Sequence, residues 1–236
     1  MEPTCVAFHL EQSEGHFWFG SRRSFLQSRL LSLFKKDDVL LDIGCGDGRE
    51  LNWMLRHVGR AYGIEPDARL GAAARERGLR VQNMPFSTAD GVECTPTFIT
   101  MFDVLEHLPD DREAIRQIYH LLPASGIFAV TVPAHQWLWT SHDVANHHYR
   151  RYSKPALLAA LQGAGFKIER VDWFGAAALL TAVALKWLGR DQGALIQSNN
   201  GFMTKIATWE YTLERYIRVP FGLSLFVVAT KHDAQT

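Results

Sequence analysis

The stretch VLLDIGCGDG at residues 39–48 decides how this chain folds. Its first half is a short apolar run, which is typical of a strand buried on both faces of a parallel sheet. Its second half is rich in glycine, which permits a tight turn and a close approach of a ligand to the backbone. Apolar residues at helical spacing follow over residues 50–58. We therefore predict a strand, a ligand-binding turn and a helix in direct succession.

The alternation of strand and helix continues after the first unit. Further strands are predicted at 61–64, 79–82, 98–102, 126–132, 166–173 and 223–230, and further helices at 68–77, 111–121 and 154–161. This order predicts an α/β fold, a doubly wound and mostly parallel seven-stranded sheet of the Rossmann type. Residues 134–152 read as a polar, histidine-rich loop.

The 236 residues, 47% of them hydrophobic, suit a single large domain with a sizeable core. We divide this domain, 1–236, into three parts. They are an N-terminal helix and lid over 1–36, a cofactor-binding half over 37–133, and a substrate-side half over 134–236 with a helical insertion at 175–217.

Composition excludes several classes of protein. The chain carries 25 basic and 25 acidic residues, whereas nucleic-acid binders have a basic surplus, so we expect no nucleic-acid partner. Its three cysteines, Cys5, Cys45 and Cys94, form no CxxC pair and predict neither a disulfide framework nor a zinc site. The first residues do not read as a signal peptide, and the apolar run 174–185 is shorter than the ~20 residues that span a bilayer. We expect a cytoplasmic protein without a transmembrane segment.

The zero net charge is a cancellation between the two halves of the chain. Residues 1–118 hold 14 basic and 18 acidic residues, and residues 119–236 hold 11 basic and 7 acidic ones. An acidic half suits a ligand with cationic groups, and a basic half steers an anion. The imbalance predicts an acceptor that bears a carboxylate or a phosphate.

Acidic residues around the glycine turn discriminate between ligands. A dinucleotide fingerprint that starts at Gly44 needs glycine at position 49, which is Arg49. Asp42 and Asp47 would repel a pyrophosphate and suit an ammonium or a sulfonium, so a nicotinamide-dependent dehydrogenase is disfavoured. Glu65, at the end of the next predicted strand, is placed to accept both hydroxyls of a ribose. The alternative for such a carboxylate is a solvated turn residue.

Four sequence blocks in order resemble the class I S-adenosylmethionine-dependent methyltransferases. The blocks are DIGCGDG at 42–48, GIEPD at 63–67, FDVLEHL at 102–108 and LLPASGIFAVTVP at 121–133. The flanks at 16–23 and 133–153 are similar to bacterial methyltransferases of the type-11 and type-23 groups. The resemblance implies S-adenosylmethionine as the cofactor, S-adenosylhomocysteine as its product, and a small-molecule, lipid-linked or saccharide acceptor.

The resemblance also assigns roles to individual residues. Asp42 and the turn backbone would hold the methionine part, Glu65 the ribose, and Asp103 the floor near the methyl group. Asn83 and Met84 stand where the family covers the adenine, often with an acidic residue that this sequence lacks. The implied cofactor-binding residues are Asp42, Gly44, Cys45, Gly46, Asp47, Glu65, Pro66, Asn83, Met84, Phe102 and Asp103.

Methyl transfer from a sulfonium is an in-line displacement that depends mainly on positioning. A hydroxyl or ammonium acceptor must also lose a proton. We predict His107, His148 and Arg151 as catalytic residues: one histidine acts as a base, and Arg150 or Arg151 binds an anionic group. Alternatively, His107 bonds to nearby backbone and the loop 134–152 faces solvent. A metal cluster of His142, Asp143, His147 and His148 is disfavoured because the spacing matches no recognised ligand set, so we expect no metal.

Two flanking segments have open roles. Trp18, Phe19, Arg22 and Arg23 form either a lid over the cofactor or a packing surface for the sheet. Residues 175–188 are most simply a buried helix, with an apolar acceptor channel or a weak membrane-surface contact as alternatives. For the whole protein, the alternative to methyl transfer is a regulatory protein that binds the cofactor without turnover.

Overall fold

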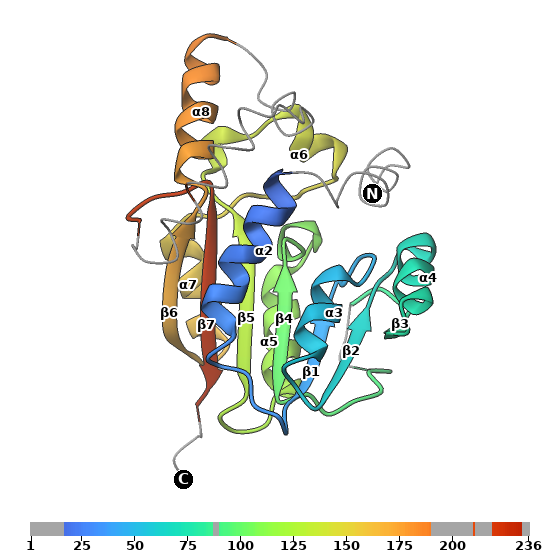
Figure 1. The fold of residues 1–236 in the computed structure, drawn as a ribbon. Helices are drawn as coiled ribbons and strands as arrows, with labels where there is room; N and C mark the ends of the chain where they lie inside the picture. The colour runs from blue at the N-terminus through green and yellow to red at the C-terminus, as the bar shows by residue number, and fades with distance from the viewer. Residues whose placement is uncertain (1–16, 87–89, 190–209, 211–218, 233–236) are drawn as a thin grey trace.

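The computed structural model describes residues 17–86, 90–189, 210 and 219–232. One seven-stranded sheet, in the order β3-β2-β1-β4-β5-β7-β6, forms the centre of the molecule (Figure 1). Only β7 runs antiparallel to its neighbours. The predicted doubly wound, mostly parallel sheet is confirmed. The strands are β1 (Val39–Ile43), β2 (Arg60–Ile64), β3 (Arg80–Gln82), β4 (Phe98–Phe102), β5 (Ile127–Pro133), β6 (Phe166–Phe174) and β7 (Ser224–Lys231).

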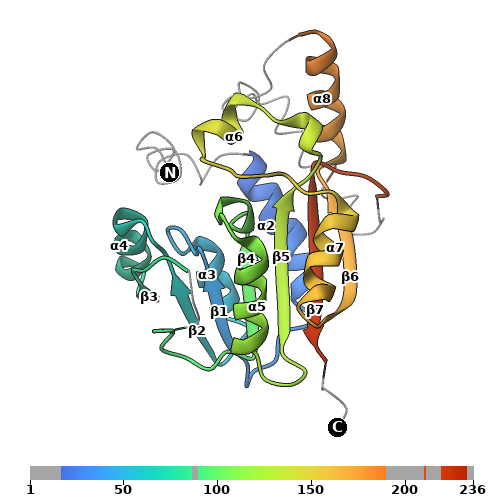
Figure 2. The ribbon, with the colours of Figure 1, turned by 180° about the vertical axis from the view of Figure 1, so that it is seen from behind.

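Helices cover both faces of the sheet (Figures 1 and 2). Apolar residues of α2 (Phe17–Leu30), α3 (Arg49–Leu55) and α4 (Ala68–Glu76) belong to the core on one face. Those of α5 (Asp111–Leu121) and α7 (Lys154–Gly163) belong to the core on the other face. The helix starts agree with the sequence because capping residues mark them: Asp67 caps α4, and Ser153 caps α7.

The helix α2 is a packed layer of the domain. Phe25 stacks on Phe174 with ring centroids 4.8 Å apart and meets the edge of Phe226 at 5.7 Å. Leu26 and Leu30 are fully buried beside it. The described part of the segment 1–36 is therefore anchored to the sheet. The side chains of residues 17–19 lie outside the description, so the lid remains a prediction.

The helix α8 (Ala176–Trp187) extends beyond the carboxyl edge of the sheet (Figure 1). Leu179 and Ala182 are buried against Leu138, but Leu180 is 61% and Trp187 88% exposed. The expectation of a buried helix is wrong for this outer face. The rest of the predicted insertion, at 190–209 and 211–218, lies outside the described residues. Within the described part of the chain, no helix combines the length and the apolarity that crossing a membrane requires.

The segment that follows β5 folds over the carboxyl edge of the sheet. It contains the short helices η2 (Gln136–Leu138) and α6 (Ser141–Ala145), where the sequence indicated only a loop. Backbone hydrogen bonds close its two ends, from Tyr152 N to Pro133 O at 2.9 Å and from His135 N to Tyr152 O at 3.0 Å. This closure holds the segment over η1 (Leu105–His107), the turn that follows β4.

Candidate functional site

Asp42 lies near the end of β1, where its side chain is almost completely buried. The hydroxyl of Thr100, its register partner on β4, donates a hydrogen bond of 2.7 Å to Oδ1. Burial raises the pKa of Asp42 to about 7, although the hydrogen bond from Thr100 opposes this rise. Among the described residues, Asp42 has no ion-pair partner within 4.0 Å. The end of β1 thus holds a buried carboxyl group that forms no salt bridge within the described residues.

The glycine turn contains one glycine that is packed against a neighbour, Gly44, and one with free space where a Cβ would lie, Gly46. Gly44 has φ of +73°, and a Cβ there would lie 2.3 Å from Cγ2 of Val104. Gly46 also has positive φ, +57°, but nothing lies within 4 Å of where its Cβ would be. Cys45 is buried, and burial raises the pKa of its thiol, so its backbone is the part left to meet a ligand. A ligand can approach this turn most closely at Gly46.

Glu65 joins the turns that follow β1 and β2. Its Oε2 accepts a hydrogen bond from Gly46 N at 2.9 Å, and its Oε1 accepts one from Asp67 N at 2.8 Å. The residue is 6% exposed, and burial raises the pKa of its carboxyl group. A carboxylate offers about four acceptor positions, so the two described bonds leave room for further donors. Glu65 also lacks an ion-pair partner within the described ranges.

Asp47 differs from these two carboxylates because its charge is compensated. Its Oδ2 lies 2.7 Å from Nε of Arg49 and 3.4 Å from a terminal nitrogen of Arg77. The structure therefore places Asp47 in an ion-pair network at the start of α3. Its assignment as a cofactor ligand remains a prediction.

The remaining predicted cofactor residues surround the end of β2. The amide of Asn83 donates to the carbonyl oxygens of Glu65 at 2.7 Å and Pro66 at 3.1 Å. Pro66 is exposed, and Met84 packs against the core. Phe102 is buried in the core beneath α2. Asn83 thus connects the end of β3 to the loop that contains Glu65, whereas Phe102 is part of the hydrophobic core.

Asp103 links the end of β4 to the N-terminal helix. It adopts a positive φ of 54°, and its Oδ1 accepts a hydrogen bond of 3.0 Å from the hydroxyl of Thr131. Its Oδ2 forms an ion pair with Arg22 of α2. This pair brings one of the predicted lid residues to the edge of the sheet.

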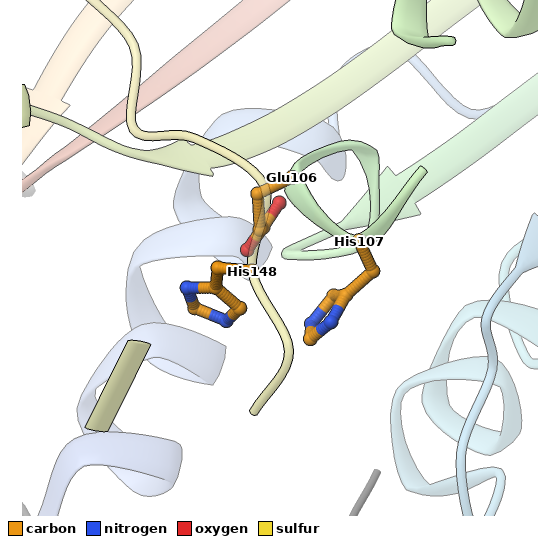
Figure 3. A group of neighbouring side chains, drawn as sticks. All are labelled: Glu106, His107 and His148. Carbon is orange, nitrogen blue, oxygen red and sulfur yellow. The ribbon is translucent and has the colours of Figure 1, made fainter. Parts of the chain in front are cut away.

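A second group of side chains meets beyond β4. Glu106 and His107 come from η1 and His148 from the segment after α6, and Figure 3 shows the three converging. Their ligand-type atoms all lie within 4.8 Å of one another. The rings of His107 and His148 are nearly perpendicular, with centroids 4.5 Å apart. The structure therefore brings together two of the three predicted catalytic residues.

Burial controls the charge states of this group. Glu106 is 1% exposed, and its Oε2 has no hydrogen-bond partner among the described residues. Burial, reinforced by Asp103, raises the pKa of Glu106 well above its usual range. Burial and the neighbouring His148 lower the pKa of His107 to about 4, so its imidazole is neutral near pH 7. One nitrogen of that ring is bonded to the backbone of Asn146.

Asp143 fixes the orientation of His148. Its Oδ1 lies 2.8 Å from Nδ1 of His148, and Arg151 binds both of its oxygens, at 2.8 Å and 2.7 Å. Burial would raise the pKa of Asp143, but the hydrogen bonds from His148 and Arg151 hold it well below its usual range. With its side chain 6% exposed, Arg151 is engaged within the protein. The geometry favours a positioning role for Arg151 over the anion-binding role predicted from the sequence.

The other histidines of the segment do not join the group. His135 contacts the carbonyl of Gly222 at 3.0 Å and stacks on Trp173. His142 contacts Asn146, and His147 is exposed. The disfavoured cluster of His142, Asp143, His147 and His148 is therefore not assembled. Glu106 is not among the predicted site residues, although its position between apolar residues in VLEHL, beside His107, was the available signal.

Comparisons with known proteins agree with this geometry. A family model described as "Methyltransferase domain" matches residues 18–171, which include every cofactor-binding and catalytic residue predicted from the sequence. The chain is 31% identical over 153 residues to a ubiquinone biosynthesis O-methyltransferase of Xanthomonas axonopodis, and 26% identical over 110 residues to a trans-aconitate 2-methyltransferase of Deinococcus radiodurans. The first match covers 56% of this chain and 64% of the relative, and the second 46% and 40%. The chain thus spans less than two thirds of the length of these relatives.

Solved structures share the whole fold. An S-adenosylmethionine-dependent methyltransferase of Mesorhizobium loti superposes with a TM-score of 0.61 at 14% identity, covering 87% of this chain and 97% of that one. At this identity the likeness shows the fold alone. The family match covers more than half of the chain, and it coincides with the four sequence blocks and with the site. The chain therefore belongs to the methyltransferase-domain family of class I S-adenosylmethionine-dependent methyltransferases.

Proposed function

We propose that this protein transfers the methyl group of S-adenosylmethionine to a hydroxyl of a small-molecule or carrier-linked acceptor. The observation that carries the proposal is the arrangement of Asp42 and Glu65. Both are buried carboxyl groups without a cationic partner in the described structure, and both lie at the carboxyl edge of one sheet. Ligands of open α/β sheets bind at this edge.

The residues at this edge fit the proposed cofactor. Glu65 has free acceptor positions for ribose hydroxyls, and Asp42 supplies a negative charge for the ammonium and sulfonium groups. The open space above Gly46 admits the ligand close to the backbone. S-adenosylmethionine supplies a methyl group on a positively charged sulfur, which departs as the neutral thioether of S-adenosylhomocysteine while the acceptor bonds to the methyl carbon.

The chain's main task in such a displacement is to hold the two reactants in line and to exclude water. Glu106 and His107 lie beyond β4 beside His148 of the segment 134–152, and we assign this group to the acceptor side. His148, held by Asp143, is oriented to accept the acceptor's proton at its other nitrogen. Arg151 stabilises this arrangement through Asp143.

The class of acceptor is inferred from two observations. The name of the Xanthomonas relative specifies methylation of oxygen, and a hydroxyl is an acceptor that benefits from a nearby base. The predicted carboxylate or phosphate on the acceptor lacks its expected partners, because Arg151 binds Asp143 and Arg150 binds Asp111 at 2.8 Å. We therefore keep the oxygen acceptor in the proposal and assign no residue to an anionic group.

Calorimetric titration with S-adenosylmethionine and S-adenosylhomocysteine tests the cofactor half of the proposal. Wild-type protein should bind both, and Asp42→Ala and Glu65→Ala should weaken binding while the proteins stay folded by circular dichroism. Absence of binding by the wild type would contradict the proposal. Binding without turnover across a broad panel of hydroxylated acceptors would instead support the regulatory alternative.

A further inference from the structure

Glu106, His107 and His148 form a group that the proposed methyl transfer does not require in full. A single base suffices to remove a proton, yet three ligand-type side chains converge within 4.8 Å. Two of them are adjacent in the sequence, and the third follows about forty residues later on a separate segment. The backbone bond from Tyr149 N to Glu106 O, 2.8 Å long, fixes that segment beside η1.

The unpartnered oxygen of Glu106 is available as a ligand for a cation. Glu106 is 1% exposed, and its Oε2 accepts no hydrogen bond within the described structure. A buried carboxylate left in this state is costly unless a cation or a proton compensates it. The neighbouring acids are already matched, since Asp103 pairs with Arg22 and Asp143 with Arg151. Glu106 is thus the acid of this region that lacks a partner of its own.

The two imidazoles present suitable ligand atoms. Nδ1 of His148 contacts Asp143, which leaves Nε2 free to bind an ion. A carboxylate behind a ligating histidine is the usual arrangement in metal sites, because it fixes the ring and increases its basicity. His107 offers a ring nitrogen that lies within 4.8 Å of the ligand-type atoms of Glu106 and His148.

We infer that Glu106, His107 and His148 bind one divalent transition-metal ion of the zinc type. Two imidazoles and one carboxylate suit Zn²⁺ or Fe²⁺ better than Mg²⁺, which prefers an all-oxygen shell. The ligand atoms of one zinc ion lie about 3–4 Å apart, because each bond to the metal is about 2.1 Å long. Side-chain rotations that move these atoms by about 1 Å would bring the three groups into contact with the ion. This proposal departs from our sequence-based expectation of no metal, because the three side chains come from segments that are distant in the chain.

Three protein ligands leave coordination positions open, as in catalytic zinc sites. The following consequence rests on the proposed function. An acceptor hydroxyl bound to the ion would lose its proton to solvent near neutral pH. The two histidines would then hold the ion, and the metal would take over the activating role assigned above to His148. Removal of the metal would abolish turnover without preventing cofactor binding.

Titration of the metal-free, untagged protein with Zn²⁺ tests the site without any assay of activity. Calorimetry against a competing chelator should show one tightly bound ion per chain. Glu106→Gln, His107→Ala and His148→Ala should each weaken zinc binding by at least about 100-fold, the loss expected when one of three ligands is removed. The control His120→Ala removes an exposed histidine on α5 and should leave the affinity unchanged.

A second measurement does not depend on the folding of any variant. Crystals of the wild type grown with Zn²⁺ should show an anomalous peak, at the zinc edge, between Glu106, His107 and His148. No binding, a peak elsewhere, or equal affinity in wild type and folded ligand variants would overturn the inference. Titration with S-adenosylmethionine in EDTA keeps the two proposals separate, because loss of cofactor binding there would contradict the function and leave the zinc result standing.

Discussion

The cofactor side and the acceptor side of the site are built in different ways. On the cofactor side, Asp42 and Glu65 come from neighbouring strands of one continuous β-α-β unit, and their carboxyl groups have no cationic partner in the described chain. On the acceptor side, His148 is carried by a separate segment whose shape depends on the buried Asp143–Arg151 pair. The carboxyl groups of the first region lie outside the described ion pairs and are proposed to meet a ligand, whereas the second region uses an internal ion pair to hold its own shape.

This difference predicts how each side responds to mutation. Removing a carboxylate on the cofactor side should reduce ligand affinity more than stability. Removing Asp143 on the acceptor side should reduce stability first, because it leaves a buried guanidinium without its partner. The experiments below separate the two responses.

The largest effect is expected from Asp143→Ala. The substitution removes the two carboxylate acceptors of Arg151 and the partner of His148, and breaking such a buried pair costs about 3–5 kcal/mol of unfolding free energy. Urea unfolding measures this loss. The control Asp37→Ala alters an exposed carboxylate and should change stability by less than about 0.5 kcal/mol. Equal stability of the two variants would contradict a structural role for Asp143.

A comparison of two glycines separates packing from ligand access. Gly44→Ala places a Cβ 2.3 Å from a stiff valine, Val104, at a positive φ, and should cost about 2–4 kcal/mol of unfolding free energy. Gly46→Ala meets no neighbour within 4 Å and should cost only about 1–2 kcal/mol of backbone strain. Its main effect should be weaker binding of S-adenosylmethionine.

Chemical denaturation of both glycine variants and of the double variant Gly44→Ala/Val104→Ala provides the measurement. The double variant should recover part of the stability that Gly44→Ala loses. If Gly46→Ala proved the less stable of the two single variants, the assignment of open space to Gly46 would be mistaken.

Glu65→Ala should weaken binding of S-adenosylmethionine by about 100-fold, because hydrogen bonds to a charged group contribute about 1.5–3 kcal/mol each. Glu65→Gln keeps a carbonyl oxygen as an acceptor and should lose only about tenfold. Calorimetry measures both affinities, and Glu93→Ala, an exposed carboxylate near β3, serves as the matched control. A wild-type affinity in Glu65→Ala would remove this residue from the cofactor site.

The smallest effect concerns pH. Burial, reinforced by Glu50 and Glu65 and opposed by Thr100 and Arg22, raises the pKa of Asp42 to about 7. A cationic ligand binds the ionised carboxylate, so affinity should be highest above pH 7 and fall by up to about tenfold per pH unit below it. Titrations between pH 6 and pH 8 measure the slope. Asp42→Asn should bind weakly with no such slope, and a slope that persisted in this variant would assign the proton to another group.

Most of the fold could be predicted from the sequence because its signals are local. Apolar runs, the glycine turn and the caps Asp67 and Ser153 each act within a few residues. The positions of Asp42 and Glu65 at the ends of β1 and β2 could be predicted for the same reason, since each residue lies beside a turn that follows an apolar strand.

The acceptor side could be predicted only in part. His107 and His148 were chosen individually, but their contact depends on hydrogen bonds between η1 and a segment about forty residues later. Arg151 was predicted to bind an anion because the sequence does not show that two nitrogens of its guanidinium bind Asp143. The exposed outer face of α8 was likewise hidden, because apolar residues such as Leu180 and Trp187 usually indicate burial.

The most direct test of the account is a crystal structure of the protein grown with S-adenosylhomocysteine. The account predicts the ribose hydroxyls on Glu65, the amino group near Asp42, and the sulfur directed toward Glu106, His107 and His148. That arrangement would place the transferable methyl group between the two regions. A ligand bound elsewhere, or a sulfur directed away from the three side chains, would contradict the claim that the two regions form one methyl-transfer site.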